Sequence, residues 1–203
     1  MVVALDLEDP SSIEDLGEKV KEEFNRVDIL LNVAGILGDG EHEPGPERSL
    51  RKLDKKWLEK SLAVNTIAPI LLCQSLTPMM RVPKKNLPSE RATSIIVNLS
   101  ARVGSISDNN GLGGWYSYRI SKSALNMATR TMSHELKRQG TWTLSLHPGT
   151  TDTDLSQPFQ KNVVKERLFP VEFTVQQLCN IIDSMEEYHT GGFYDWAGKA
   201  LPF

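Results

Sequence analysis

The feature that most constrains the fold of this chain is an alternation of short aliphatic runs with longer segments of helical period. The aliphatic runs are nearly continuous, as in strands buried on both faces, and the segments between them place apolar residues three or four positions apart. Such alternation is typical of a parallel sheet covered by helices. We predict strands at Met1–Leu7, Asp28–Val33, Ser94–Leu99, Thr141–His147 and Gly192–Trp196, and helices at about 13–24, 52–80, 116–139 and 174–187.

Loops of unusual composition follow these strands. A polar loop with prolines extends to about Leu50, the glycine-rich segment 104–114 follows the third strand, and an irregular stretch extends from Thr150 to about Pro170. Pro69 is expected to kink the helix at 52–80. Because open parallel sheets bind ligands beyond the C-terminal ends of their strands, we expect the functional site among these loops.

The composition is that of an ordinary globular chain of 203 residues, with a formal net charge of −3. Its apolar runs are far shorter than the roughly 20 residues that cross a membrane, and no basic segment precedes an apolar one at the N-terminus. We therefore expect a soluble intracellular protein, cytoplasmic by default, with neither a membrane nor a nucleic-acid partner. The basic stretch Arg81–Arg91 is expected to be a solvated loop, and Cys73 and Cys179 to be buried thiols on helices.

Tyr118 and Lys122 are the pair of side chains with the clearest chemical use. They stand four residues apart on the helix predicted at 116–139, so they lie about 40° apart on one helix face and can meet. A phenol has an ordinary pKa of about 10, and an ammonium group one turn away favours its ionised form. Tyr116 points about 120° away from that face and is expected to pack or to contact a substrate. On many helices such a pair is merely solvated, so the surrounding motifs decide the interpretation.

Other catalytic arrangements fit the sequence poorly. A serine hydrolase requires Gly-x-Ser-x-Gly between a strand and a helix, whereas Ser100 stands in Asn98-Leu99-Ser100-Ala101-Arg102. The histidines have no metal-ligand spacing, so no metal site is predicted. His147, at a strand end before a proline, is expected to be packed or to lie beside a cofactor.

Five motifs resemble, in order and spacing, those of the short-chain dehydrogenase/reductase family. They are Asn32-Val33-Ala34-Gly35 after a strand, Val64-Asn65 in the next helix, Val97-Asn98-Leu99-Ser100 at a strand end, Tyr118-Arg119-Ile120-Ser121-Lys122, and Pro148-Gly149. The segments 113–118 and 191–196 look like the C-factor-like branch of that family. The resemblance covers essentially the whole chain. It implies an α/β fold, a Rossmann-like three-layer domain with a parallel sheet, which here would be a single incomplete NAD(P)-binding domain over residues 1–203.

The resemblance also implies an oxidoreductase that transfers a hydride between NADP or NAD and a small-molecule carbonyl or alcohol. On the matching positions, Tyr118 would exchange the hydroxyl proton, Lys122 would lower the pKa of Tyr118 and hold the nicotinamide ribose, and Asn65 would hold a relay water. Further cofactor contacts would come from Asp6 and Leu7 at the adenine, from Asn32, Val33, Ala34 and Gly35, and from Pro148, Gly149 and Thr153 beside the carboxamide. The helices that carry Asn65 and Tyr118 commonly form a dimer interface in the family, so a homo-oligomer is expected.

One departure from the family pattern concerns the serine that polarises the carbonyl. It is usually the second residue of a Ser-Ser pair, and Ala101 takes that place here. Ser100 adjoins the expected place, whereas Ser105 stands thirteen residues before Tyr118, a common family spacing. We favour Ser100 and keep Ser105 as the alternative.

A second departure concerns the cofactor's phosphates. The family motif Gly-x-x-x-Gly-x-Gly does not occur, and the chain starts with what resembles strand three of the family. The first two strands, the first helix or helices and any targeting segment are therefore expected to be missing. Without those backbone amides, cofactor binding should be weakened, and the strand that begins at Asp28 should become an apolar sheet edge. The alternative function is a catalytically silent form that acts as a partner-binding or dimerising module.

Overall fold

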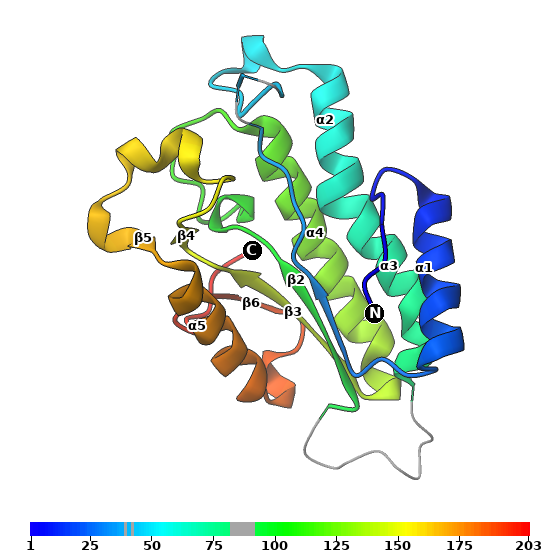
Figure 1. The fold of residues 1–203 in the computed structure, drawn as a ribbon. Coiled ribbons are helices and arrows are strands. Elements are labelled where there is room, and N and C mark those ends of the chain that lie inside the picture. Colours follow the sequence, from blue (N-terminus) through cyan, green and yellow to red (C-terminus); the bar gives the residue numbers. More distant parts are fainter. Residues whose placement is uncertain (39, 42, 82–91) are drawn as a thin grey trace.

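The computed structural model describes residues 1–38, 40–41, 43–81 and 92–203. At its centre is a fully parallel four-stranded sheet in the order β1-β2-β3-β6 (Figure 1). These strands are β1 (Ile29–Asn32), β2 (Ser94–Leu99), β3 (Thr141–His147) and β6 (Gly192–Asp195). The predicted α/β class with a parallel sheet is thus confirmed, and four of the five predicted strands form the sheet.

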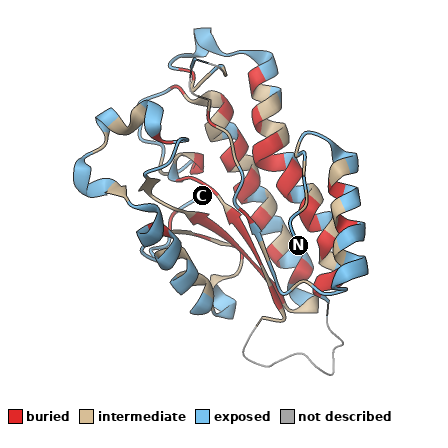
Figure 2. Cartoon of the chain, viewed as in Figure 1, coloured by how far each residue is buried: buried red, intermediate tan, exposed pale blue. Residues whose placement is uncertain are grey.

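Helices cover both faces of this sheet. One layer holds α1 (Pro10–Glu23), α2 (Lys55–Leu62), α3 (Ala68–Leu76) and α4 (Tyr116–Glu135), and the other holds α5 (Val171–Asp183) (Figure 1). Successive side chains of β2 point to opposite faces of the sheet and so contact both helix layers. Ile96 packs against Cys73 and Met80, whereas Val97 packs beneath Leu178 of α5. Buried residues therefore concentrate in the sheet and on the helix faces turned towards it (Figure 2).

The helix expected at 52–80 is interrupted by a π-helical turn, η2 (Ala63–Ile67), between α2 and α3. It begins at Lys55, where the Asp54 carboxylate accepts a hydrogen bond of 2.8 Å from the Trp57 N–H, and it ends in the 3₁₀ turn η3 (Thr77–Met80). In a regular α-helix the ring of Pro69 would meet the carbonyl of Asn65, four residues earlier. The wider π turn relieves that clash, so the distortion expected at Pro69 lies one turn earlier, around Asn65.

By length and composition alone, the described segment Lys55–Met80 could also span a membrane. Half of its most apolar window is buried inside the protein, and α2 packs along α4. This segment therefore has the surroundings of a core helix, and its length and composition are weak support for a membrane span.

Residues 1–7 do not form the strand predicted for them. Leu5 and Leu7 instead pack against Ile13 of α1 and Ala68 of α3. The apolar side chains of this segment thus pack against two helices, and its backbone does not pair with the sheet.

β1 is an edge strand and is not buried on both faces as predicted. Among the described residues it pairs with β2 alone, and the side chains of Ile29 and Leu31 are each 50% exposed. They are in register with Ile95 and Val97, on the face that α5 covers further along the sheet. The apolar sheet edge expected at this strand is present.

The remaining elements agree with expectation within a few residues. α4 continues as the 3₁₀ turn η6 (Leu136–Gln139) and stops at Gly140, whose φ of +77° suits glycine. α5 begins and ends earlier than predicted, and a small parallel pair, β4 (Thr150–Thr151) and β5 (Leu168–Phe169), closes the irregular stretch. The other short 3₁₀ turns are η1 (Leu50–Lys52), η5 (Arg102–Gly104), η7 (Gln157–Asn162), η8 (Lys165–Arg167) and η9 (Glu187–His189).

The two cysteines differ in their surroundings. Cys73 is buried as predicted, and burial raises the pKa of its thiol to about 12. Cys179 is exposed, contrary to the prediction, because the half-buried residues Leu178, Ile181 and Ile182 form the side of α5 that packs on the sheet and Cys179 lies off it. Of the basic stretch 81–91, residues 82–91 lie outside the described residues.

Candidate active site

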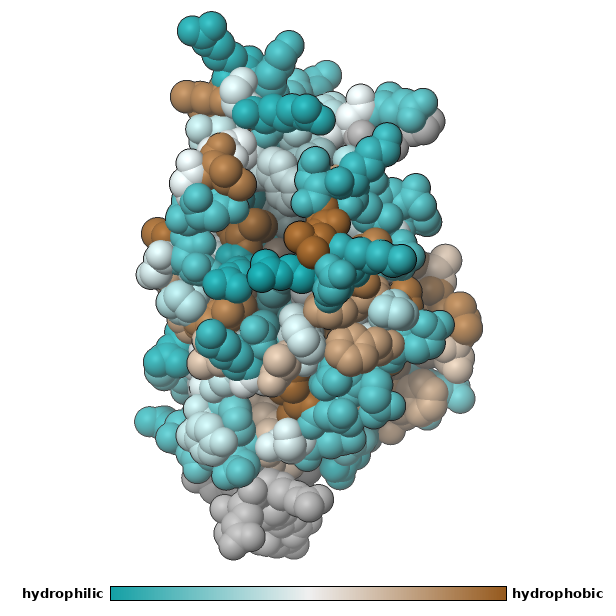
Figure 3. Space-filling model, turned by 90° about the vertical axis from the view of Figure 1, so that its left-hand side faces the viewer, coloured by the Kyte–Doolittle hydropathy of each residue, from teal (hydrophilic) through white to brown (hydrophobic). Residues whose placement is uncertain are grey.

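A cavity of about 870 Å³ lies at the C-terminal ends of β1, β2 and β3, where the sequence placed the functional site. The loop after β1, residues 99–103 after β2 and residues 147–151 after β3 line it, together with α4 and several residues between 153 and 178. The side of the molecule that carries α5 and the segment 150–170 mixes hydrophobic and hydrophilic side chains (Figure 3).

Lys122 is the buried cation of this cavity. Its side chain lies one turn after Tyr118 on α4, and its Nζ is 5.7 Å from the centroid of the Tyr118 ring. Nζ donates a hydrogen bond of 2.7 Å to the carbonyl of Leu99 at the end of β2. Burial lowers the pKa of Lys122 to about 8, because a charged ammonium loses its hydration there. The predicted meeting of Tyr118 and Lys122 is therefore present in the structure.

Tyr118 forms part of the cavity wall. Burial raises the pKa of its phenol to about 12, so the group is protonated at neutral pH. Its ring packs edge-on against Trp115, with ring centroids 6.3 Å apart. Tyr116 does not line this cavity, in agreement with the direction predicted for it.

Asn65 sits in the π turn and is fully buried. Its Oδ1 accepts a hydrogen bond of 2.7 Å from the Ile36 N–H, and its Nδ2 donates to the Ile36 carbonyl at 2.8 Å and to Ser121 Oγ at 3.1 Å. The side chain thus ties the loop after β1 to the helix that carries Tyr118 and Lys122. The distorted turn is what presents Asn65 to that loop.

The two candidate serines occupy different surroundings. Ser100 lines the cavity, and its buried Oγ has no hydrogen-bond partner in the described chain. Ser105 is not among the lining residues, and its Oγ accepts a hydrogen bond of 2.9 Å from the Asp108 N–H. This difference supports Ser100 as the serine that meets a ligand.

The positions expected to contact a cofactor divide into two groups. Five line the cavity, namely Val33, Gly35, Pro148, Gly149 and Thr153. Four do not, namely Asp6, Leu7, Asn32 and Ala34.

Each residue of the second group has another setting. The Asn32 amide donates to Asn98 Oδ1 at 2.8 Å inside the core, and Ala34 is exposed. Asp6 is exposed and accepts a hydrogen bond from the Glu8 N–H, while Leu7 packs against α1 and α3.

His147 lies in the cavity wall, as expected for a residue beside a ligand. Burial lowers the pKa of its imidazole to about 4, with Arg102 adding to the effect and Asp195 opposing it. Its Nδ1 is buried and has no hydrogen-bond partner among the described residues. The side chain is therefore neutral and has a ring nitrogen left for a ligand.

Sequence reasoning missed two features of the site. Trp115 adopts a left-handed conformation with φ of +58°, and its ring packs 5.1 Å from Phe159 across the cavity wall. Glu47, which is 4% exposed, accepts hydrogen bonds from the Ser117 N–H and hydroxyl at the first turn of α4. The glycine pair before Trp115 indicated an unusual turn, whereas nothing in the polar loop distinguished Glu47 from a solvated acid.

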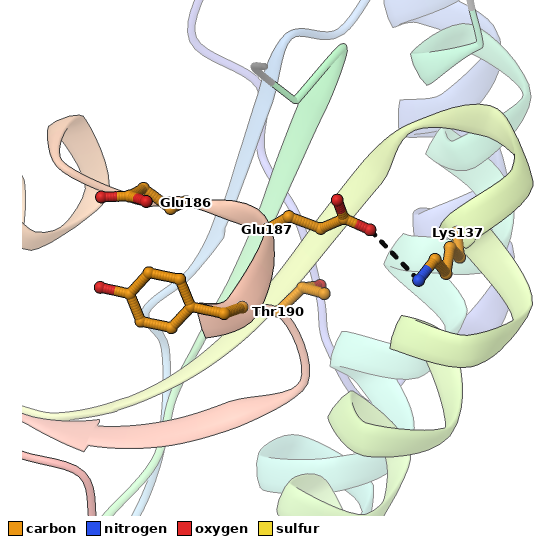
Figure 4. A pocket seen from close by; sticks show the side chains of 5 residues that line it. Lys137, Glu186, Glu187 and Thr190 are labelled. Carbon is orange, nitrogen blue, oxygen red and sulfur yellow. Dashed lines mark ion pairs between the residues drawn. The ribbon is translucent and has the colours of Figure 1, made fainter. Parts of the chain in front are cut away.

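A second hollow, of about 700 Å³, lies at the opposite, N-terminal ends of β3 and β6 (Figure 4). Lys137 and Glu187 form an ion pair of 3.1 Å across it, with both side chains well exposed. Exposed ion pairs contribute little free energy and need no ligand.

Comparisons with known proteins agree with this fold. The family model of the short chain dehydrogenases matches residues 1–163. The chain is 30% identical to the C-signal protein of Myxococcus xanthus over 177 residues, which covers 87% of this chain and 93% of that protein. It is 32% identical over 155 residues to 1-hydroxy-2-glutathionyl-2-methyl-3-butene dehydrogenase of Rhodococcus sp. (strain AD45), covering 76% of this chain and 60% of that enzyme.

Solved structures show the same relationship. NADPH-bound carbonyl reductase from chicken fatty liver superposes with a TM-score of 0.85 at 28% identity, covering 100% of this chain and 77% of that one. The carbonyl reductase Sniffer of Drosophila melanogaster gives a TM-score of 0.85 at 28% identity, covering 99% and 77%. The fold is that of a Rossmann-like oxidoreductase. The chain belongs to the short-chain dehydrogenase family.

The described residues fit one part of the dinucleotide that this family uses. At Gly35 an added Cβ would lie 3.1 Å from Asn65 Oδ1 and 3.3 Å from Lys122 Nζ, so the backbone in this part of the cavity wall packs closely against both polar groups. Pro148, Gly149 and Thr153 line the same cavity, which suits the nicotinamide end. The sequence has no Gly-x-x-x-Gly-x-Gly turn to hold the phosphates.

Proposed function

We propose that this chain reduces the carbonyl group of a small molecule with NADPH or NADH. The observation that carries the proposal is the buried Lys122 ammonium, which has no carboxylate partner among the described residues and lies 5.7 Å from the Tyr118 ring. A buried cation without an acid is costly for stability, so its position beside a phenol in a cavity indicates a functional group.

The protonation states favour reduction over oxidation. Burial keeps the Tyr118 phenol protonated, so it can donate a proton to a carbonyl oxygen that gains negative charge. Lys122, with a pKa of about 8, is mainly charged at neutral pH and stabilises the phenolate that remains. Ser100 Oγ, which has no hydrogen-bond partner among the described residues, donates a hydrogen bond to the same oxygen.

When bound, the cofactor supplies the hydride. Gly35, Pro148, Gly149 and Thr153 would hold its nicotinamide end, and Lys122 the ribose. NADPH is the first cofactor to test, because the chicken carbonyl reductase structure contains it. Binding is expected to be weaker than in a chain that contains the glycine-rich turn.

The test compares two tyrosines two residues apart. Turnover of a panel of aldehydes and ketones with NADPH and NADH is measured for the wild type, Tyr118→Phe and Tyr116→Phe. We expect Tyr118→Phe to lose about 10²- to 10⁴-fold in kcat, the usual contribution of a general acid, and Tyr116→Phe to stay near the wild type. Unchanged turnover in Tyr118→Phe would contradict the proposal.

The same proposal includes a homodimer through the helices that carry Asn65 and Tyr118. Their outer faces expose Ile67 (51%), Ile70 (37%), Ile120 (43%) and Met127 (68%), and η2 and α4 lie in contact. Adjacent exposed apolar residues of this kind favour self-association. Light scattering after size exclusion should give twice the monomer mass, and Met127→Lys should give a monomer. Ile106→Lys, at another exposed apolar residue, is the control.

A second candidate is a silent dimerising module, favoured by the apolar β1 edge and the absence of a phosphate-binding turn. Calorimetric titration of NADPH and NADH into the purified chain separates the two candidates. Micromolar binding contradicts the module, whereas no binding combined with dimerisation supports it.

A further inference from the structure

Arg119 is a cation in the cavity wall that has no acidic partner within the described part of the chain. It follows Tyr118 on α4, and it lines the same cavity. Its Nε donates to the Gly114 carbonyl at 3.1 Å and its Nη2 to Asn110 Oδ1 at 3.0 Å. Its Nη1 is buried and has no hydrogen-bond partner in the described chain.

This position is unfavourable for an arginine on structural grounds alone. A buried donor without a partner costs free energy, and the cost is greater for a charged group. Arg119 also lies in the first turn of α4, where the helix dipole repels cations, and the acid at that turn, Glu47, hydrogen bonds to the Ser117 N–H and hydroxyl. Arg102, which lines the same cavity, is by contrast paired with Asp108.

The two hydrogen bonds that Arg119 does make are to neutral acceptors. A glutamine or lysine side chain could also donate a hydrogen bond to such acceptors, so these bonds do not account for a guanidinium at this place. What a guanidinium adds is a permanent charge and paired donors that match a carboxylate.

We infer that Arg119 binds a carboxylate of the substrate, so that the cavity takes small carbonyl compounds that also carry an acid group. This inference rests on the proposed function and adds the substrate class to it. The carboxylate itself does not react. Trp115 and Phe159, which pack together in the wall, provide an apolar surface for the body of such a compound.

The experiment uses a matched pair of substrates, 4-carboxybenzaldehyde and 4-methylbenzaldehyde, with NADPH. The quantity measured is the ratio of their kcat/KM values in the wild type, Arg119→Gln, Arg119→Lys and Arg138→Met. Arg119→Gln keeps neutral donors near Gly114 and Asn110, and Arg119→Lys keeps the charge. Arg138 is an exposed arginine in η6, and its variant is the control.

We expect the wild-type ratio to favour the acid by about tenfold to a hundredfold, the range that hydrogen bonds to a charged group support. The ratio should fall towards one in Arg119→Gln, mainly through KM, be partly restored in Arg119→Lys and stay unchanged in Arg138→Met. If Arg119 merely holds the glycine-rich loop, both substrates lose by the same factor and the ratio does not move, which overturns the inference.

Binding without turnover separates this inference from the proposed function. Benzoate and benzamide are titrated into the wild type and Arg119→Gln, with tryptophan fluorescence as the signal because Trp115 is in the wall. Tighter binding of benzoate that is lost in Arg119→Gln, without any carbonyl turnover, supports the anion site and refutes the reductase. If turnover depends on Tyr118 but the wild-type ratio of the two kcat/KM values is near one, the result supports the reductase and refutes the anion site.

Discussion

Lys122 lies directly against Gly35, with its Nζ 3.3 Å from the point where a Cβ of residue 35 would stand. Asn65 Oδ1 is 3.1 Å from the same point, so the two polar groups would have to move by a few tenths of an ångström to admit a methyl group. The loop after β1 and the helix α4 therefore meet through a residue without a side chain. That contact joins the loop that follows β1 to the Tyr118–Lys122 pair of α4.

Gly35→Ala is expected to displace the Lys122 ammonium or the Asn65 amide and to lower kcat/KM for carbonyl reduction about tenfold or more. Small displacements in an active site have effects of this size or larger. The measurement is steady-state kinetics beside a thermal melt. Ala34→Ser, one residue earlier and exposed, is the control. Wild-type kinetics in Gly35→Ala would show that the close contact has no bearing on the reaction.

Glu47→Ala is expected to destabilise the protein by about 1 to 3 kcal/mol, because it removes a buried acceptor from the first turn of α4. The Ser117 N–H and hydroxyl, which both hydrogen bond to the Glu47 carboxylate, would lose that acceptor. Urea unfolding at neutral pH measures the change. Glu47→Gln keeps an acceptor oxygen and should lose less, so equal losses in both variants would argue against a capping role.

Lys122→Met is expected to raise stability at pH 7 while abolishing turnover. The pKa of Lys122 is about 8 in the folded chain and 10.5 in a free lysine, so burying the charged form costs roughly 3 kcal/mol at pH values below 8. Between about pH 8 and 10.5 the unfolded chain holds more protons on this group, so its contribution to stability rises with pH. Urea titrations at pH 7 and pH 10 should show the advantage of the variant shrinking, and a constant difference would refute the shift.

His147 is expected to make the stability of the folded chain depend on pH in the acidic range. Its pKa is about 4 when folded and 6.5 when free, so the unfolded chain holds more protons between these values and stability falls as the pH falls through this window. The expected loss from this group is roughly 2 to 3 kcal/mol. His147→Gln stays neutral throughout and should lose less between pH 7 and pH 4.5 in urea unfolding. Parallel losses in both proteins would assign the effect to other groups.

The sequence predicted the sheet and the helix that carries Tyr118 and Lys122 because both depend on local patterns. β2 and β3 have the predicted bounds because their runs are aliphatic and are bounded by turns. Tyr118 and Lys122 meet because a spacing of four residues on a helix fixes their relative direction.

The predictions that were wrong concern features that depend on contacts between distant parts of the chain. The apolar residues Leu5 and Leu7 suit a strand equally well as a packed coil, and their contacts with α1 and α3 decide the outcome. The exposure of Ile29 and Leu31 follows from how far α5 extends across the sheet. The role of Glu47 arises from a contact seventy residues along the chain, which no local pattern encodes.

The π-helical turn at Ala63–Ile67 determines how the side chains of α3 are rotated about the helix axis relative to those of α2. Such a turn contains an extra residue relative to an α turn, which rotates every later side chain by about 100° with respect to a regular helix. One inserted residue therefore fixes the direction in which the buried residues Ala68 and Leu72 of α3 point relative to the buried Trp57 of α2. A single-residue deletion here would straighten the helix and misdirect either Asn65 or the core. Insertions and deletions in this helix are thus constrained both by the placement of Asn65 and by packing of the core.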